Sequence, residues 1–485
     1  MVTSPSDPVY DVVVIGAGPA GLAAATRAGS HDATVALVDA GAAPGGQYWR
    51  QPARPEAANA SGVPGLDPDD LAYLHHDLTG YRHLVDLLDR QQQHGISDYL
   101  AEHHVWALER DGDLFVVHAL DRSGPDERTR TLLGRTLVLA TGAYDRQVPF
   151  PGWDLPGVMT AGGAQALLKG HGVRAGQRVV VAGTGPFLLP VAAGLATSGA
   201  QVVGVHEAGS PLAWLRHGRA VVRNLTKLGE GVGYAASLAR QRVPVRTRSV
   251  LVAAHGDDRL EAVTVARADG KGGIASGSEE RIACDTLAVG WGFTPQLELP
   301  LALGCATRVD VDESLVCVVD DDQLSSVPGV YIAGETCGVG GAALALVEGA
   351  IAGAAAAGVA VADQRLRRQR DALRRFASAM HRAHPVPSGW VSRVEPDTVV
   401  CRCEEVTADR LRESVDRLGA ADARSAKLLA RVGMGWCQGR VCGYAASCLT
   451  STWSGTPYAP DLVATRPVAT PVRLGTLADA QQEER

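Results

Sequence analysis

The feature that most constrains this 485-residue chain is a local pattern that occurs twice: an apolar strand, a glycine-rich turn and an apolar helix. In the first copy the run 10–15 leads into Gly16-Ala17-Gly18-Pro19-Ala20-Gly21, and in the second the run 178–182 leads into Gly183-Thr184-Gly185-Pro186. Each copy continues into another apolar run that ends near an acidic residue, so each predicts a βαβ unit. Two such units predict an α/β chain with two dinucleotide-binding domains.

The first turn has the complete glycine spacing of a dinucleotide site. Gly16 permits the tight turn, Gly18 lets the backbone approach a pyrophosphate, and Gly21 lets the helix pack closely on the strand. Pro19 and Ala20 lie between these glycines, at a helix N-terminus whose N–H groups attract phosphate. Asp39 ends the next strand, where an acidic group can hold a ribose hydroxyl. The turn therefore predicts an ADP-containing dinucleotide.

The second turn is less complete. Leu188 stands where the third glycine belongs, and Pro186 removes a backbone donor. Gly183 and Gly185 keep the first two positions, and Glu207 is placed to hold a ribose. Three states of this site stay open: NAD(P), another adenine nucleotide, or no ligand.

Five of the nine cysteines lie close together near the C-terminus. Cys401 and Cys403 form one close pair, and Cys437 and Cys442 form a second pair in a glycine-rich segment. Four thiolates suit a [2Fe–2S] cluster or zinc, although the one-residue spacer of the first pair fits a zinc knuckle less well. Incidental thiols are the third alternative, and Cys448 is expected to be a buried, non-ligating residue.

Other patterns exclude whole classes of protein. No Cys-x-x-Cys occurs, which excludes a disulfide reductase that exchanges adjacent thiols with its substrate. A net charge of −7 argues against a surface that binds nucleic acid. No uninterrupted apolar run is long enough to span a membrane, and the first residues lack the layout of a secretory signal. These features predict a cytoplasmic location.

Three segments carry a resemblance to known flavoproteins. They are Ala43-Pro-Gly-Gly-Gln-Tyr48, Ala140-Thr-Gly-Ala143 and Tyr331-Ile-Ala-Gly-Glu335, and they resemble the recurring segments of the glutathione-reductase-like fold. The resemblance implies FAD at the first turn, with Gly46, Gln47, Thr141 and Gly142 among its contacts. It also implies that Gly334 and Glu335 contact the ribityl chain or pyrophosphate, with Glu335 standing where an Asp is commoner.

The cysteine segment resembles the bacterioferritin-associated-ferredoxin-like [2Fe–2S] domain, in which two helices separate the two cysteine pairs. Helices are expected here from Thr407 to about Leu418 and over Ala423–Arg431. The resemblance implies that Cys401, Cys403, Cys437 and Cys442 ligate the cluster.

Taken with these segments, residues 141–161 and 433–443 make nearly the whole chain similar to the larger flavoprotein subunit of opine oxidases, hydrogen cyanide synthase and dye-linked proline or hydroxyproline dehydrogenases. The resemblance implies an FAD-binding domain (1–155 and 285–363), a second nucleotide-binding-like domain (156–284), a linker helix (364–390), a small helical [2Fe–2S] domain (391–455) and a C-terminal tail (456–485). Residues 52–68 are expected to form a long loop, and the linker helix is expected to be exposed.

The same resemblance implies a function. The chain would pass electrons through FAD and the cluster to an acceptor of the quinone or dye type. A smaller subunit, similar to D-amino-acid oxidase, would oxidise the C–N bond of an amino acid, imino acid or opine; a small third subunit and peripheral membrane attachment through the acceptor stay open. No residue of this chain is assigned as catalytic, and Arg50 and Arg146 are interpreted as structural or solvated. Two other functions stay open: a self-contained NAD(P)H-dependent FAD/iron–sulfur oxidoreductase and a non-catalytic nucleotide-binding scaffold subunit.

Overall fold

A computed structural model describes residues 8–51, 74–217, 225–270, 273–360, 363–460 and 468–483. The loop expected over residues 52–68 lies outside these ranges.

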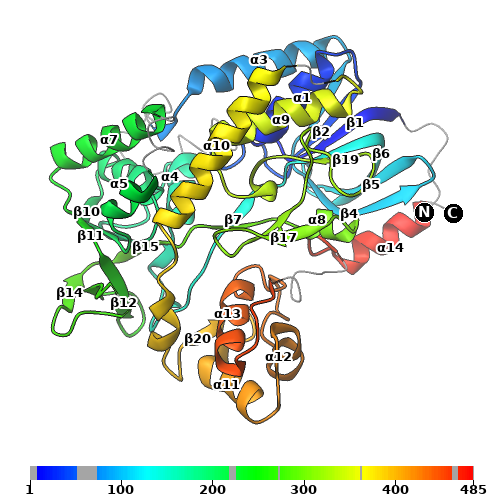
Figure 1. Cartoon of the computed structure of the whole chain (residues 1–485). Coiled ribbons are helices and arrows are strands. Elements are labelled where there is room, and N and C mark those ends of the chain that lie inside the picture. The colour runs from blue at the N-terminus through cyan, green and yellow to red at the C-terminus, as the bar shows by residue number, and fades with distance from the viewer. Residues whose placement is uncertain are drawn as a thin grey trace.

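The first domain is built on a mostly parallel sheet with the strand order β3-β2-β1-β6-β5-β4 (Figure 1). The long strand β6 is shared: its first half pairs antiparallel with β5, and its last three residues pair parallel with β19. Strand β2 is buried throughout and β1 along most of its length, as expected for parallel strands that are covered on both faces. The strands are β1 (Val9–Ile15), β2 (Val35–Val38), β3 (Ser97–Leu100), β4 (His103–Asp111), β5 (Leu114–Asp121), β6 (Arg128–Leu139) and β19 (Val330–Ile332).

The second domain is built on a five-stranded parallel sheet with the order β11-β10-β9-β15-β8. Its strands are β8 (Val158–Thr160), β9 (Arg178–Gly183), β10 (Gln201–Glu207), β11 (Val245–Thr247) and β15 (Thr286–Gly290). Strand β15 pairs with both β9 and β8, so this sheet extends past the boundary we expected at residue 284. The apolar run of β15 gives no local sign of which sheet it joins, because both sheets are parallel and buried.

Helix α9 (Ala342–Ala356) packs against α1 (Pro19–Gly29) over the first sheet. A Cβ atom on Gly349 would lie 2.0 Å from the Ala20 carbonyl oxygen, and one on Gly353 would lie 2.2 Å from that of Ala24. The small residues of this Gly/Ala-rich helix therefore serve close packing, as its composition predicts. The contact holds the first glycine turn against the rest of the domain.

Helix α10 (Gln364–Ala383) runs diagonally across the molecule from α9 toward the C-terminal domain (Figure 1). We expected an exposed helix, but one face is packed. Arg374 forms a 2.6 Å ion pair with the buried Glu348 of α9, and Arg370 pairs with Asp321 at 2.8 Å. Asp321 lies 49 positions from Arg370 and Glu348 lies 26 positions from Arg374, so the sequence pattern of the helix does not indicate these two partners.

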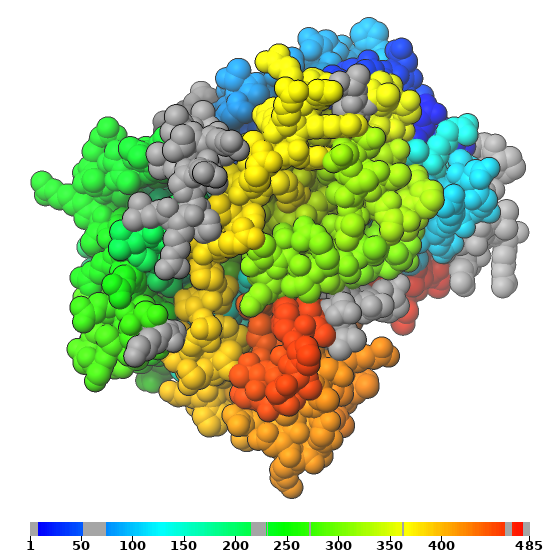
Figure 2. All heavy atoms as spheres, in the orientation of Figure 1, coloured from blue at the N-terminus to red at the C-terminus, as the bar shows by residue number. Residues whose placement is uncertain are grey.

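The C-terminal domain is a small helical lobe (Figure 2). It consists of the hairpin β20 (Val399–Cys401) and β21 (Val406–Thr407), followed by α11 (Ala408–Asp416), α12 (Ala423–Ala430) and α13 (Gly443–Ser454). The Thr407 side chain caps α11 by accepting a hydrogen bond from the Arg410 N–H. The two helices expected between the cysteine pairs are therefore present.

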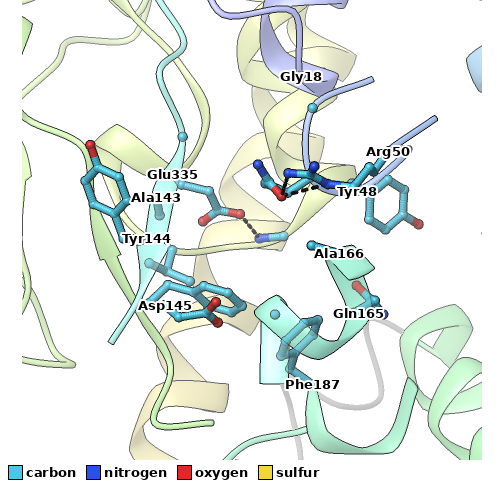
Figure 3. Close-up of a pocket in the computed structure, with 18 of the residues that line it drawn as sticks. Gly18, Tyr48, Arg50, Ala143, Tyr144, Asp145, Gln165, Ala166, Phe187 and Glu335 are labelled. Carbon is cyan, nitrogen blue, oxygen red and sulfur yellow. Dashed lines mark hydrogen bonds between the residues drawn. The ribbon is translucent and has the colours of Figure 1, made fainter. Parts of the chain in front are cut away.

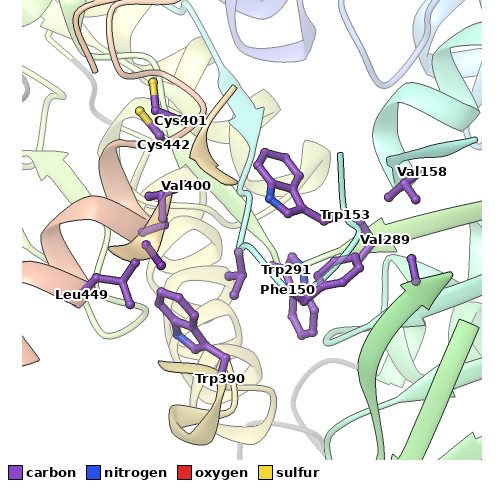
Figure 4. Packing of buried hydrophobic residues seen from close by; sticks show 14 of the residues in the cluster. Phe150, Trp153, Val158, Val289, Trp291, Trp390, Val400, Cys401, Cys442 and Leu449 are labelled. Atoms are coloured by element: carbon purple, nitrogen blue, oxygen red, sulfur yellow. The ribbon is translucent and has the colours of Figure 1, made fainter. Parts of the chain in front are cut away.

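One continuous apolar core joins the C-terminal domain to the second domain (Figure 4). Trp153 lies in this core and donates its indole N–H to the Val399 carbonyl at 2.6 Å, while the Arg402 guanidinium lies over its ring at 5.3 Å. Trp390, Val400 and Leu449 continue the same core around Cys401 and Cys442. The lobe is thus packed onto its neighbour through buried side chains and is not tethered by the linker alone.

The remaining elements connect these parts. They are helices α3 (Leu78–Gln93), α4 (Ala161–His171), α5 (Leu188–Thr197), α7 (Leu225–Arg240), α8 (Glu298–Ala302) and α14 (Leu474–Glu483), the 3-10 turns η2 (Pro211–His217), η3 (Gly334–Cys337) and η4 (Ser388–Arg393), and strands β7 (Ala143–Asp145), β12 (Ser249–His255), β13 (Ala262–Arg267), β14 (Glu280–Ala283), β16 (Phe293–Pro295), β17 (Thr307–Val309) and β18 (Leu315–Cys317). Within the described ranges, every helix is too short or too polar to cross a membrane.

Candidate functional site

A large cavity of about 1690 Å³ lies between the two dinucleotide domains (Figure 3). Both glycine turns line it, through Gly16 and Gly18 on one side and Gly185 on the other. Cys437 of the C-terminal domain lines it as well. The cavity therefore brings together parts of all three predicted sites.

The first glycine turn has the close contacts that its spacing predicts. Gly16 has a φ of +101°, and a Cβ atom on Gly21 would lie only 1.6 Å from the Gly16 carbonyl oxygen. Gly18 differs, because a Cβ atom there would have its nearest neighbour at 4.0 Å, in Gly46, and the residue faces the cavity. Helix α1 begins directly after Gly18 at Pro19, without a side-chain cap and without an acidic residue in its first turn. Its first N–H groups, including that of Ala20, are thus left for an anion in the cavity.

Asp39 lies where β2 ends and is held by the backbone. One carboxylate oxygen accepts from the Ala17 N–H at 2.5 Å, and the other accepts from the Gly41 N–H at 2.6 Å. Burial raises the pKa of this carboxyl, and the two N–H groups counteract the shift. Each oxygen keeps a lone pair for a further donor, so the geometry still fits a ribose hydroxyl.

The loop after β2 folds back onto the first turn. A Cβ atom on Gly46, whose φ is +59°, would lie 2.8 Å from the Gly18 Cα. Arg50 lines the cavity, is partly buried and donates hydrogen bonds to the Gln47 side-chain carbonyl. Arg146 is structural as expected: it is 3% exposed and pairs with Asp312 at 3.0 Å.

Two further segments expected at the flavin site also line the cavity. Thr141 donates to the Gln296 carbonyl at 2.9 Å, and Gly142, with a φ of +79°, accepts from the Gln296 N–H at 2.9 Å. Gly334 donates its N–H to the buried Glu348 at 3.1 Å. The two oxygens of Glu335 accept from the N–H groups at positions 340 and 341, at 2.8 and 3.0 Å. Figure 3 draws one of these bonds. Burial raises the pKa of the Glu335 carboxyl.

At the second turn, the acidic residue Glu207 is contacted by other groups of this chain. One Glu207 oxygen accepts from the Gly185 N–H at 2.8 Å. The other accepts from the Gly209 N–H at 2.7 Å and lies 3.4 Å from His384, at the end of α10. The imidazole of His384 also accepts from the Trp214 indole N–H at 2.9 Å. Gly183, with a φ of +136°, makes the tight turn itself.

The four cysteines at the C-terminal site lie close enough to influence one another. Cys401 and Cys442 lie side by side (Figure 4), and Cys403 and Cys437 interact with each other. The Cys442 thiol and backbone N–H groups, among them that of Gly433, lower the pKa of Cys401 to about 6. Across the described ranges, no three His, Cys, Asp or Glu side chains converge to hold a single metal ion. Cys448 is partly buried outside these pairs, and burial raises its pKa to about 12.

Arg440 connects the cysteine segment to the first domain through hydrogen bonds and an ion pair, which the sequence patterns do not predict. It donates to the Tyr144 hydroxyl at 3.0 Å, pairs with the buried Glu298 at 2.9 Å and donates to the Cys437 carbonyl at 3.2 Å. Its position between two cysteines was a usable signal, but its partners on β7 and α8 are remote in sequence. Lys169 of α4, also on the cavity wall, lies in no motif at all.

Comparisons with known proteins agree with this geometry. The model of the pyridine nucleotide-disulphide oxidoreductase family matches residues 10–359. The HcnB subunit of hydrogen cyanide synthase from Pseudomonas protegens is 32% identical over 445 residues, which cover 89% of this chain and 90% of that protein. An opine oxidase subunit of Rhizobium meliloti is 33% identical over 488 residues, which cover 97% of this chain and 99% of that protein.

Among solved structures, the L-proline dehydrogenase from P. horikoshii superposes with a TM-score of 0.66 at 20% identity, covering 97% of this chain and 80% of that one. This likeness shows the fold over nearly the whole chain. The family model matches most of the chain, and both relatives are more than 30% identical over most of both sequences. These comparisons therefore show the family as well as the fold. The chain belongs to the pyridine nucleotide-disulphide oxidoreductase family, and within it to the flavin-dependent oxidoreductases that include these opine oxidase and hydrogen cyanide synthase subunits.

Proposed function

We propose that this chain is the FAD- and [2Fe–2S]-containing electron-transfer subunit of a multisubunit dehydrogenase. The complex oxidises the C–N bond of an amino acid, imino acid or opine and passes the electrons to an acceptor of the quinone or dye type. The observation that carries the proposal is the shared cavity, which is lined by the first glycine turn at Gly18 and by the cysteine segment at Cys437.

The residues around the first turn fit FAD. The uncapped N-terminus of α1 offers N–H groups to a pyrophosphate, and Gly18 leaves the space that the phosphates need. Asp39 retains lone pairs for a ribose hydroxyl. When bound, FAD takes up two electrons together, whereas a [2Fe–2S] cluster transfers one at a time.

The cysteine segment fits a [2Fe–2S] cluster better than a single zinc ion. Four thiolates match the two iron atoms of a [2Fe–2S] cluster, each of which takes two, and the one-residue spacer between Cys401 and Cys403 fits a zinc knuckle less well. Backbone N–H groups directed at the Cys401 sulfur would also stabilise its thiolate. Arg440 then holds the segment at a fixed place beside the cavity.

A partner subunit is part of the proposal. The two relatives described above are named as subunits of opine oxidase and of hydrogen cyanide synthase. By analogy, a smaller flavoprotein subunit similar to D-amino-acid oxidase oxidises the C–N bond of the substrate. We also propose that the complex is cytoplasmic.

Metal analysis of anaerobically purified protein tests the cluster. We expect about two irons per chain and a rhombic EPR signal after reduction. Cys437→Ser removes one proposed ligand and is expected to lose the iron, whereas the control Cys448→Ser retains it. Stoichiometric zinc without iron would contradict the assignment.

Reconstitution tests the electron-transfer role. Loaded with FAD and iron, the isolated chain is expected to reduce no dye with proline, glycine or an opine, and activity appears when the partner subunit is added. Amine turnover by the isolated chain would make it a complete dehydrogenase instead.

A second candidate is an NAD(P)H-dependent reductase, favoured by the extension of the cavity to Gly185 at the second turn. Prompt bleaching of the flavin spectrum by NADH or NADPH alone would support it. Bleaching only with partner and amine supports the electron-transfer role, and no bleaching under either condition supports a scaffold role.

A further inference from the structure

Two cationic side chains line the cavity beside the loop that follows β2. Lys169 of α4 is only 5% exposed, and its ammonium group donates to the Tyr48 carbonyl at 3.0 Å. Arg50 donates to the Gln47 side-chain carbonyl from the same loop. In Figure 3, Arg50 and the preceding turn of α4, at Gln165, face the same space.

The two cations lie close enough to repel each other. A Cβ atom on Gly170 would lie 3.1 Å from Arg50 Cδ, so Arg50 packs against α4 next to Lys169. Burial, and then the charge of Arg50, lower the pKa of Lys169 to about 8. Burial and the charge of Lys169 likewise lower the pKa of the nearby His75 to about 4. This part of the cavity wall therefore carries two neighbouring cationic groups.

Among the described residues, no carboxylate forms an ion pair with Lys169 or Arg50, and the shift of the Lys169 pKa includes no acidic contribution. Asp39 acts on Arg50 through its charge, but its two oxygens are held by backbone N–H groups. The described contacts of the buried Lys169 ammonium are the carbonyl and the ring of Tyr48, which do not neutralise its charge, so its burial remains costly. An anion that enters the cavity would offset that cost.

The volume of the cavity leaves room for such a ligand. Small-molecule sites commonly measure about 300–1,000 Å³. The cavity here measures about 1690 Å³ and extends from the first turn to the second domain and the cysteine segment. A dinucleotide at the first turn therefore does not fill it.

We propose that Lys169 and Arg50 form a subsite for the anionic group of a second small molecule, which occupies this cavity beside the dinucleotide. The group is a carboxylate or a phosphate, since an ammonium ion and a guanidinium fork recognise both. A carboxylate would belong to an amino acid or a related substrate, and a phosphate to a nucleotide. The subsite goes beyond the electron-transfer role, which requires no anion site of this kind.

Calorimetric titration of the FAD-loaded chain tests the subsite, with inorganic phosphate, adenosine monophosphate, glycine and L-proline as probes. We expect at least one probe to bind, and Lys169→Met and Arg50→Gln each to weaken it about tenfold to a hundredfold, the usual effect of losing one charged hydrogen bond. The matched control is Arg174→Gln, which removes an exposed cation just beyond α4 and is expected to leave binding unchanged. Binding of the phosphates alone identifies a nucleotide, and binding of the amino acids identifies a carboxylate ligand.

Thermal unfolding gives an independent readout. The anion that binds raises the melting temperature of the wild-type chain but not that of Lys169→Met, because only the folded wild type binds it. Lys169→Met also loses the hydrogen bond to the Tyr48 carbonyl, so the melting temperature of this variant without anion is the reference for its response to anion. Three outcomes would overturn the proposal: no probe binds, Lys169→Met weakens binding no more than Arg174→Gln does, or Lys169→Met and Arg50→Gln lose FAD itself, which would assign the pair to the dinucleotide.

Discussion

Among the described residues, the acidic residue of the first glycine turn accepts hydrogen bonds from the backbone of its own βαβ unit, whereas that of the second turn also lies beside a remote part of the chain. Asp39 accepts from the N–H groups of Ala17 and Gly41. Glu207 makes the equivalent backbone bonds to Gly185 and Gly209, but it also lies 3.4 Å from His384 of the linker. The two turns share a topology and differ in what approaches their acidic residue.

The two βαβ units have the same fold, but only in the second does a distant segment of the chain pack beside the acidic residue. At the second turn the Thr184 hydroxyl also approaches the Pro385 carbonyl, at 3.4 Å, and Trp214 of the same domain bonds to His384. The residues that follow α10 therefore pack beside Glu207, the acidic residue of the second turn. The first turn stays open toward the cavity, so we expect ligand binding to depend on the first turn and the stability of the linker contact to depend on the second.

The largest expected effect is the loss of flavin from Gly18→Val. The backbone of Gly18, with a φ of −72°, accommodates a side chain, and the protein atom nearest to the added Cβ is the Gly46 Cα at 4.0 Å. The valine side chain would instead occupy the space of the pyrophosphate, so the folded variant is expected to contain almost no FAD. Flavin absorbance per chain measures the effect, and Gly185→Ala at the second turn is expected to retain full flavin. Retention of flavin by Gly18→Val would contradict the assignment of the first turn.

A smaller difference is expected between the two acidic residues. Asp39→Asn weakens the hydrogen bonds to a ribose and is expected to cost about 1.5–3 kcal/mol, or about tenfold to a hundredfold in FAD affinity. Glu207→Gln is its matched control and is expected to leave FAD affinity unchanged. Dissociation constants of FAD, measured by flavin fluorescence, report both effects. An equal loss of FAD affinity in the two variants would contradict the conclusion that FAD depends on the first turn alone.

Much of the local structure could be predicted from the sequence because short-range patterns determine it. The residues of α3, Leu78–Gln93, follow from helical spacing alone, and the cap of α11 at Thr407 follows from the preference of threonine for that position. The tight turn at Gly16 and the close packing of α1 at Gly21 also follow, since close backbone contacts at both positions exclude a side chain. These features depend on neighbours in the sequence.

Contacts between distant segments could not be predicted in the same way. The bond from Trp153 to Val399 joins residues 246 positions apart, and it is central to the docking of the C-terminal domain. The ion pair between Arg440 and Glu298, and the second-sheet partners of β15, are of the same kind. Lys169 belongs to no sequence motif, so the sequence does not indicate that it lines the cavity. Its position there depends on the packing of α4 and not on its neighbours in the chain.

A pH effect is expected at the second domain. His206 of β10 is 1% exposed, accepts or donates a bond to Ser249 at 2.8 Å, and burial lowers its pKa to about 4. In the unfolded chain this histidine has its ordinary pKa of about 6.5. Between about pH 6.5 and pH 4 the unfolded chain therefore binds more protons than the folded chain. The free energy of unfolding consequently decreases as the pH falls through this range. The loss is on the order of 2 kcal/mol, measured by urea unfolding at about pH 7 and about pH 5. His206→Asn keeps a partner for Ser249 but cannot titrate, and is expected to lose less stability over this range.

The smallest expected effect concerns the linker contact that distinguishes the second turn. His384→Ala removes the acceptor of the Trp214 indole N–H and the imidazole beside Glu207, and such neutral hydrogen bonds contribute about 1 kcal/mol. Urea unfolding is expected to show a loss of that size, and hydrogen exchange should rise in β10 and the end of α10 while remaining unchanged in α1 and β1. The control His94→Ala alters an exposed histidine at the end of α3 and is expected to change neither. If His384→Ala instead lowered flavin content, the second turn and its linker would support the first site, and the separation of roles between the two turns would be wrong.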